Sequence, residues 1–300
     1  MSDLLQRIAG GPITWGVDGS PGWGHLLGSD RVMTEMADTG LRATELGPDG
    51  FLPTDPDELV DYVGGFGLQV VSGFVPAVLY RDRSIDDQLS YVDRATAQLA
   101  RSGSEVVVLG PDSHHDGYDI EVEMTDDEWA VFLANLGDLM NTVGEHGLST
   151  ALHPHWGMAI ARQHHVERLL ESCEVGVCLD VGHLYLAGCD PLEVAKLASG
   201  RIDHVHLKDV DDTMADRVRG GDLAFRQAVI DGMFKPLGSG GVDIRGVVKH
   251  LEADGYRGWY VLEQDAALAD DPPLDEGPRV DAATSVAYLQ EVAAELEEPR

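Results

Sequence analysis

One pattern recurs along the chain: an amphipathic helical segment, a glycine where that helix should end, and a short apolar segment. It occurs in the stretches TGLRATELG, FGLQVVSGF, RSGSEVVVLG, HGLSTALHPH and DGYRGWYVLEQD. Their glycines, Gly40, Gly67, Gly103, Gly147 and Gly255, stand where a helix commonly ends in a left-handed residue, a conformation open to glycine without steric cost. Each stretch is therefore expected to join a helix to the strand that follows it.

Start signals mark the helices between these junctions. Thr125 and Glu128 have the spacing of a capping box, and Ser84 precedes Ile85 and Leu89 at helical spacing. Helix and strand therefore alternate. The strands are expected near residues 12–17, 43–47, 69–76, 105–110, 149–155, 175–181, 202–208 and 258–264.

Continuous apolar runs such as EVVVLG and VGVCLD are typical of parallel strands covered by helices. Eight such units in 300 residues predict a single (β/α)8 TIM barrel that forms one domain over residues 1–300. A doubly wound sheet is the alternative, but its G-x-G-x-x-G fingerprint does not follow the first expected strand.

Charge and cysteine content exclude several partners. The 21 Lys and Arg residues stand against 53 Asp and Glu residues, and the net charge of −32 would repel nucleic acid and anionic membrane surfaces. Cys173, Cys178 and Cys189 show no C-x-x-C spacing, so neither a disulfide framework nor a zinc ribbon is expected. Without a signal peptide or a run of about 18 apolar residues, the chain is expected to be cytoplasmic.

Polar side chains gather at the ends of the expected strands. In a TIM barrel these ends meet at one mouth, where catalytic groups lie. The residues at these positions are Glu45, His153, His155, Asp180, His183, His204, His206, Lys208, Glu263, Gln264 and Asp265.

A lone histidine at a strand end is more often a core or rim residue than a metal ligand. Asp180, His206 and Glu263, however, each end a separate strand, and this convergence favours a metal site. Imidazole and carboxylate ligands suit Mn²⁺, Co²⁺, Zn²⁺ or Fe²⁺. His204, His206 and Lys208 share one face of their strand, which looks toward either the barrel axis or the helices.

The motifs PITW, TELG, HPH, CLDVGH, DHVHLKDV and VLEQD, with PLGSGGVD later, span nearly the whole chain. Together they resemble the inosose dehydratase group of the xylose-isomerase-like sugar isomerase/epimerase superfamily. This resemblance implies a TIM barrel and a divalent cation, with Mn²⁺ or Co²⁺ first and Zn²⁺, Fe²⁺ or Mg²⁺ as alternatives. The implied roles are metal ligand for Asp180, His206 and Glu263, substrate contact for His183 and Lys208, and pocket shaping for Trp15 and Glu45.

The chain departs from this superfamily at the fifth strand. Many members end that strand with a carboxylate ligand, whereas this chain has His153, and it has Met158 and Ala161 where relatives often have Thr and Glu or Gln. The expected ligand set is therefore His153, Asp180, His206 and Glu263, with His155 as the rival to His153.

The expected substrate is a small polyol ketone or keto-sugar, and the expected first step is removal of an α-proton to give an enolate. Superfamily epimerases use two glutamate bases, whereas this chain keeps Glu263, and His153, His155, His183 and Lys208 are candidates for the acid. Dehydration of a keto-inositol is therefore favoured over keto-sugar epimerisation or isomerisation, and over β-elimination on a 3-keto-glycoside.

Two further alternatives come from other classes of protein. A non-catalytic sugar-binding barrel stays open, while a DNA-repair endonuclease is disfavoured by the charge. The sequence also leaves a homo-oligomer open.

Overall fold

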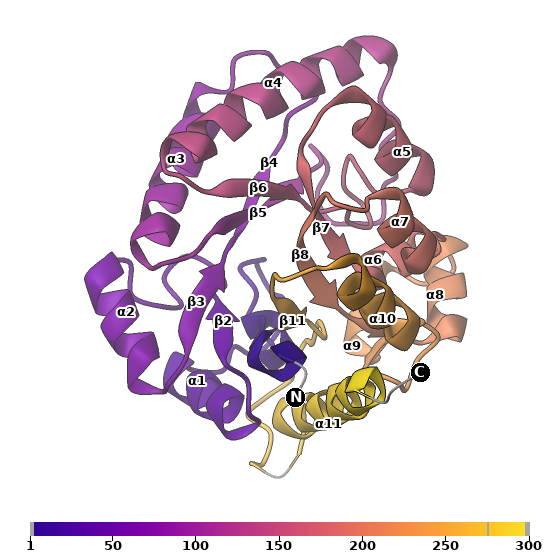
Figure 1. Ribbon diagram of the computed structural model, residues 1–300. Coiled ribbons are helices and arrows are strands. Elements are labelled where there is room, and N and C mark those ends of the chain that lie inside the picture. The colour runs from indigo at the N-terminus through magenta and orange to yellow at the C-terminus, as the bar shows by residue number, and fades with distance from the viewer. Residues whose placement is uncertain (1–2, 275, 298–300) are drawn as a thin grey trace.

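The computed structural model describes residues 3–274 and 276–297, which form a barrel of parallel strands surrounded by helices (Figure 1). The strands follow the order β3-β2-β1-β11-β8-β7-β6-β5-β4. Their bounds are β1 Ile8–Gly10, β2 Ala43–Glu45, β3 Gln69–Ser72, β4 Phe74–Ala77, β5 Val106–Pro111, β6 Ser149–Leu152, β7 Gly176–Asp180, β8 Ile202–Leu207 and β11 Tyr260–Leu262.

The barrel closes through Gly73, the one residue between β3 and β4. On one side of this break Leu46 donates its N–H to Ser72, and on the other Val108 donates its N–H to Gly73. The segments β3 and β4 thus act as one strand that bridges β2 and β5. The result confirms the predicted (β/α)8 TIM barrel.

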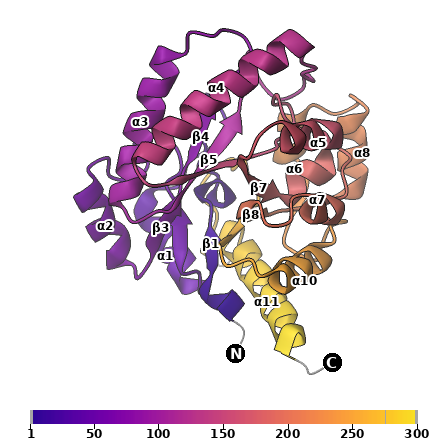
Figure 2. The same cartoon turned by 45° about the horizontal axis from the view of Figure 1, so that its top comes forward.

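Helices cover the outside of the barrel, with α1 to α4 around one half and α5 to α11 around the other (Figures 1 and 2). The α-helices are α1 Ser29–Asp38, α2 Pro56–Gly65, α3 Asp86–Arg101, α4 Asp126–Glu145, α5 Gln163–Ser172, α6 Val181–Leu186, α7 Pro191–Leu197, α8 Asp212–Arg219, α9 Phe225–Ile230, α10 Ile244–Asp254 and α11 Pro278–Glu297. The remaining elements are the 3-10 helices η1 Asp3–Gln6 and η2 Pro12–Trp15 and the small pair β9 Asp209–Val210 and β10 Phe234–Lys235. Across the described ranges, no helix combines the length and the apolar character needed to cross a membrane.

The five junction glycines all have positive φ angles, between 76° and 90°, as the repeated pattern predicted. The capping box is also confirmed, because Thr125 and Glu128 exchange hydrogen bonds at the start of α4. The predicted helix start at Ser84 is wrong. Helix α3 begins at Asp86, and its N-cap residue Ile85 makes no side-chain cap.

The first strand was predicted at residues 12–17, but β1 spans Ile8–Gly10 and the PITW motif forms η2. Pro12 has no N–H to donate to a strand partner and suits the first position of a helix. Gly16, with φ of 76°, then ends this 3-10 helix.

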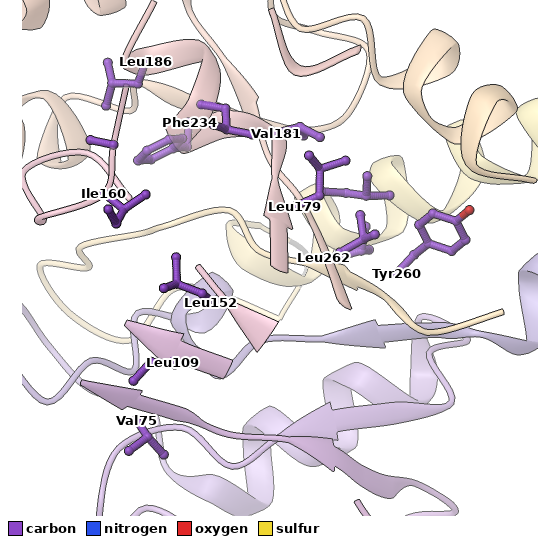
Figure 3. Packing of buried hydrophobic residues seen from close by; sticks show 14 of the residues in the cluster. Val75, Leu109, Leu152, Ile160, Leu179, Val181, Leu186, Phe234, Tyr260 and Leu262 are labelled. Carbon is purple, nitrogen blue, oxygen red and sulfur yellow. The ribbon is translucent and has the colours of Figure 1, made fainter. Parts of the chain in front are cut away.

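Side chains alternate between the inside of the barrel and the helices, as the period of a strand requires. On β7, Cys178 lies in a small inner cluster with Val106, Val108 and Ala151, whereas Leu179 belongs to the large core under the helices. Figure 3 shows part of that large core, including Leu179. The inward positions near the carboxyl ends of the strands are polar, and they form the site.

Candidate active site

The register of the sheet decides which strand-end residues meet. His206 on β8 is paired with Asp180 on β7 and with Val261 on β11. Paired residues of parallel strands share a face, and the next residue on that face comes two positions later. Lys208 and Glu263 therefore lie one layer above His206, toward the mouth.

Asp180, His206 and Glu263 form a cluster whose ligand atoms all lie within 4.8 Å of one another. Asp180 is held by its local structure, because it is the N-cap of α6 and its Oδ1 accepts the N–H of His183 at 2.7 Å. Its Oδ2 is thereby directed toward His206 Nδ1, at 3.5 Å, while Glu263 Oε2 lies 3.0 Å from the same nitrogen. The structure thus brings together the three ligands that the resemblance implied.

The nitrogen Nδ1 of His206 is the strongest sign that this cluster suits a cation. It is buried and near two carboxylate oxygens, yet it has no hydrogen-bond partner among the described residues. A nitrogen and two carboxylate oxygens facing one point are a donor set for a first-row divalent cation. The residues present therefore fit a metal ion.

Lys208 lies at the centre of the polar residues and is about 1% exposed. Its Nζ donates to Asp265 Oδ1 at 2.7 Å and lies 3.0 Å from Glu263 Oε2 and 3.4 Å from Asp180 Oδ2. Burial alone would lower the pKa of Lys208, but the charges of Asp180, Asp265 and Glu263 raise it well above its usual value. Lys208 is therefore an ammonium ion.

The carboxyl groups around this ammonium ion differ in protonation. Burial would raise the pKa of Glu263, but His206 and Lys208 hold it at about 2, so Glu263 is a carboxylate. Burial raises the pKa of Asp265 to about 7, and Lys208 offsets this only in part.

His183 faces the same lysine. The Lys208 ammonium donates to Nε2 of His183 at 3.0 Å, so the ring proton of His183 is on Nδ1. This Nδ1 is buried and has no hydrogen-bond partner within the described parts of the chain. Burial, together with His155 and Lys208, holds the pKa of His183 well below its usual value.

The fifth strand was predicted over 149–155, but β6 ends at Leu152, and the HPH motif follows it. His153 still continues the sheet through its N–H to Leu109, and its Nε2 lies 3.2 Å from Asp180 Oδ2. His155 donates from Nδ1 to the carbonyl of Trp156 at 2.6 Å, and burial lowers its pKa to about 3. Of the two, His153 is the one in contact with the three-residue cluster.

Trp15 and Glu45 lie in different surroundings. Trp15 is fully buried, its indole donates to Glu35 Oε2 at 2.8 Å, and it does not line the cavity described below. Glu45 does line that cavity, and it accepts from His204 and His206. The structure therefore places Glu45 in the site, whereas Trp15 lies outside the cavity lining.

A cavity of about 530 Å³ opens above the cluster. Its lining includes His153, His155, His183, Lys208 and Glu263, which come from four different strand ends. A second hollow, of about 600 Å³, lies at the opposite end of the barrel among residues such as Glu105, Asp203 and Trp259. The cluster of Asp180, His206 and Glu263 is at the first cavity, which makes that cavity the candidate active site.

Another group of potential ligands lies on the surface, formed by Glu123, His164 and His165. The Nδ1 of His165 accepts the N–H groups of Ala161 and Arg162, both at 3.3 Å. The ring proton of His165 is therefore on Nε2, the nitrogen that faces Glu123. That proton blocks metal binding there, which leaves the barrel mouth as the better site.

The structure adds residues that the sequence had not assigned a role. Asp265, in the VLEQD motif shortly after β11, accepts a hydrogen bond from Lys208. Tyr118 lines the cavity from a loop without any periodic pattern, so no sequence signal marked it. Gly182, in the DVGH motif, leaves space for the stem of Lys208, since a Cβ there would lie 2.6 Å from its Cβ and Cγ.

A closed parallel barrel with its reactive groups at the carboxyl ends of the strands defines a TIM-barrel enzyme. Residues 33–291 match the model of the xylose isomerase-like TIM barrel family, and the chain belongs to this family.

Its relatives include a rhizopine catabolism protein and several inosose dehydratases. The rhizopine catabolism protein MocC of Rhizobium meliloti is 33% identical over 265 residues, which cover 86% of this chain and 81% of that protein. An inosose dehydratase of Geobacillus kaustophilus is 32% identical over 277 residues, covering 88% of this chain and 89% of that enzyme.

Solved structures show the same fold. The zinc-bound IolI protein has a TM-score of 0.71 at 14% identity, with 98% of this chain and 100% of that one covered. An L-ribulose 3-epimerase has a TM-score of 0.70 at 18% identity, with 97% and 95% covered. At these identities the likeness concerns the fold alone.

Proposed function

We propose that this protein is a metal-dependent dehydratase that removes water from a keto-inositol through an enolate. The observation that carries this proposal is the cluster of Asp180, His206 and Glu263 at the cavity. The inosose dehydratases among the relatives are a second support.

The donor set suits Mn²⁺ or Co²⁺, with Zn²⁺, Fe²⁺ or Mg²⁺ as alternatives. Asp180, His206 and Glu263 would hold the cation, with His153 as the fourth ligand from the fifth strand. A cation bound there would polarise the ketone and stabilise the enolate.

Glu263 is the proposed base. Its low pKa keeps it ionised at neutral pH, so it can accept the α-proton as the electron pair of the broken C–H bond moves toward the ketone oxygen. Lys208, whose Nζ lies 3.0 Å from Glu263 Oε2, stabilises the negative charge of the enolate that this step forms.

Lys208 is the proposed acid, and His183 positions it. When the enolate collapses and the C–O bond to the β-hydroxyl breaks, the Lys208 ammonium, which lines the cavity, gives the departing hydroxide a proton, and Glu263, 3.0 Å away, returns the α-proton to Lys208. Nε2 of His183 accepts from Lys208 at 3.0 Å and holds the ammonium in place. Because its pKa is about 3, His155 is uncharged at neutral pH, and it orients substrate hydroxyls by hydrogen bonding.

Charge at the cavity supports an uncharged substrate. Asp18, Asp49 and Asp112 are among its lining residues, and no arginine occurs among the described residues that line it. The charge of Lys208 is already balanced by three carboxyl groups. A phosphate or carboxylate on the substrate would be repelled, whereas a neutral keto-inositol or keto-sugar fits.

The test is incubation of metal-loaded protein with a 2-keto-inositol, followed by mass spectrometry. Loss of one water that a chelator abolishes supports the proposal. An unchanged mass with altered stereochemistry would assign the protein as an epimerase, and no change with either substrate class would leave a sugar-binding barrel.

Metal content tests the site itself. Asp180→Ala, His206→Ala and Glu263→Ala should each lower the bound cation sharply from about one per chain. His164→Ala in the surface cluster is the matched control and should keep full occupancy. The single domain over residues 1–300, the cytoplasmic location and a homo-oligomer stay predictions from the sequence.

A further inference from the structure

Glu45 forms the floor of the site. It contacts His206, the imidazole in the cluster of Asp180, His206 and Glu263. A single oxygen, Oε1, accepts from Ser72 Oγ at 2.6 Å, from His204 Nε2 at 2.9 Å and from His206 Nε2 at 3.1 Å. All four side chains are buried. Three donors around one oxygen fix the carboxylate in one orientation.

This arrangement determines which nitrogen of His206 carries the proton. A carboxylate only accepts hydrogen bonds, so the proton of a neutral His206 is on Nε2 and the lone pair is on Nδ1. Nδ1 is the buried nitrogen without a partner among the described residues, and it faces Asp180 and Glu263. With the opposite tautomer, Nδ1–H would point toward the proposed cation site. The lone pair of Nε2 would then face a lone pair of Glu45 Oε1.

We propose that Glu45 is a positioning residue that holds His206 with its proton on Nε2, so that Nδ1 is the metal-binding nitrogen. Ser72 and His204 hold Glu45 in turn. The same interactions leave no free lone pair on Nε2 of His204 or His206, so Glu45, His204 and His206 are not a second cation site although their ligand atoms lie close together. This inference rests on the proposed metal dependence and assigns Glu45 a role through His206 rather than in substrate binding.

Zinc affinity, measured by competition with a chromophoric chelator, tests this role. Glu45→Ala should weaken zinc binding about 10- to 100-fold, the usual effect of losing a group that orients a histidine ligand. Glu45→Gln should restore most of the affinity, since its amide oxygen still accepts from Nε2–H. Glu252→Ala is the matched control: Glu252 also accepts two hydrogen bonds, from Arg7 and Tyr260, and should leave affinity unchanged.

The tautomer itself is visible in the ¹⁵N NMR spectrum of zinc-loaded, histidine-labelled protein, with His206 assigned by its absence in His206→Asn. The expected signal has the proton on Nε2 and zinc on Nδ1. Zinc on Nε2, or equal affinities for Glu45→Ala and Glu252→Ala, would overturn the role of Glu45. A change in KM for the ketone without a change in zinc affinity would also overturn it, in favour of substrate binding. Failure of the wild-type protein to bind zinc or any other divalent cation would instead overturn the proposed function, and this inference with it.

Discussion

The ammonium group of Lys208 lies 2.7 Å from Oδ1 of Asp265 at the mouth of the barrel, where both side chains are buried. The same ammonium group lies within 3.4 Å of oxygens of Asp180 and Glu263. One ammonium group thus contacts three carboxyl groups, two of which are proposed to hold the metal. We therefore expect Lys208 to stabilise these buried carboxyl groups when no metal is bound.

Lys208→Met should destabilise the metal-free protein by about 3–5 kcal/mol, because it leaves buried carboxylates without their partner. Added Zn²⁺ or Mn²⁺ should recover part of the loss, since a bound cation also balances Asp180 and Glu263. Denaturant unfolding with and without chelator measures both effects. Lys196→Met, which breaks an exposed pair with Glu193, should change stability by less than about 1 kcal/mol. Equal losses for the two variants would show that Lys208 has no such role.

His153 tests the proposed preference for dehydration over epimerisation. His153→Glu should keep metal binding, because it supplies the usual carboxylate. It should lower the dehydration rate, because the net positive charge of the metal and its ligands falls by one unit. His153→Ala should lower both metal occupancy and turnover. His155→Ala is the comparison, since its Nδ1 is already bound to the Trp156 carbonyl, and it should keep metal occupancy. Wild-type occupancy and rate in His153→Ala would show that His153 is not a ligand.

Gly182→Ala should disturb the site without removing any polar group. The new Cβ would lie 2.6 Å from Cβ and Cγ of Lys208, whose stem is buried and cannot move away freely. Overpacking of this kind costs about 1–3 kcal/mol. We expect a lower unfolding midpoint and a slower reaction. Gly137→Ala in α4 is the control, because its Cβ would meet no atom within 4 Å, and it should be neutral or slightly stabilising.

Cys189 should resist alkylation in the folded protein. Burial raises the pKa of its thiol to about 11, so only about one molecule in a thousand carries a thiolate at pH 8, against roughly a quarter for an ordinary cysteine. Because the pKa is raised, the alkylation rate should keep rising about tenfold per pH unit above pH 8, whereas in unfolded protein it should level off. Iodoacetamide labelling followed by peptide mass spectrometry measures this. A rate equal to that of the unfolded chain would contradict the burial of Cys189.

The sequence determined the elements and the edge of the barrel at which chemistry occurs. The junction glycines and the apolar runs are local signals, so they predicted strands near residues 105–110 and 175–181 that agree with β5 and β7. Asp180, His206 and Glu263 could be chosen because the ends of parallel strands meet at one mouth whatever the details of packing. The first strand was misplaced because the PITW segment is apolar, which is typical of a strand. Pro12 at its start and Gly16 after its end make it a 3-10 helix instead.

Only the tertiary structure decided how each polar group is oriented and paired. Glu45 meets His206 across 161 residues of chain, and Lys208 meets Asp265 across 57. Trp15 donates to Glu35 and does not line the cavity, although Pro12 and Ile13 of the same PITW motif do. Local periodicity determines which face of a strand a residue occupies. The partner of a buried charge or ring nitrogen depends instead on strand register and on the free-energy cost of leaving that group unpaired. Both depend on closure of the whole barrel.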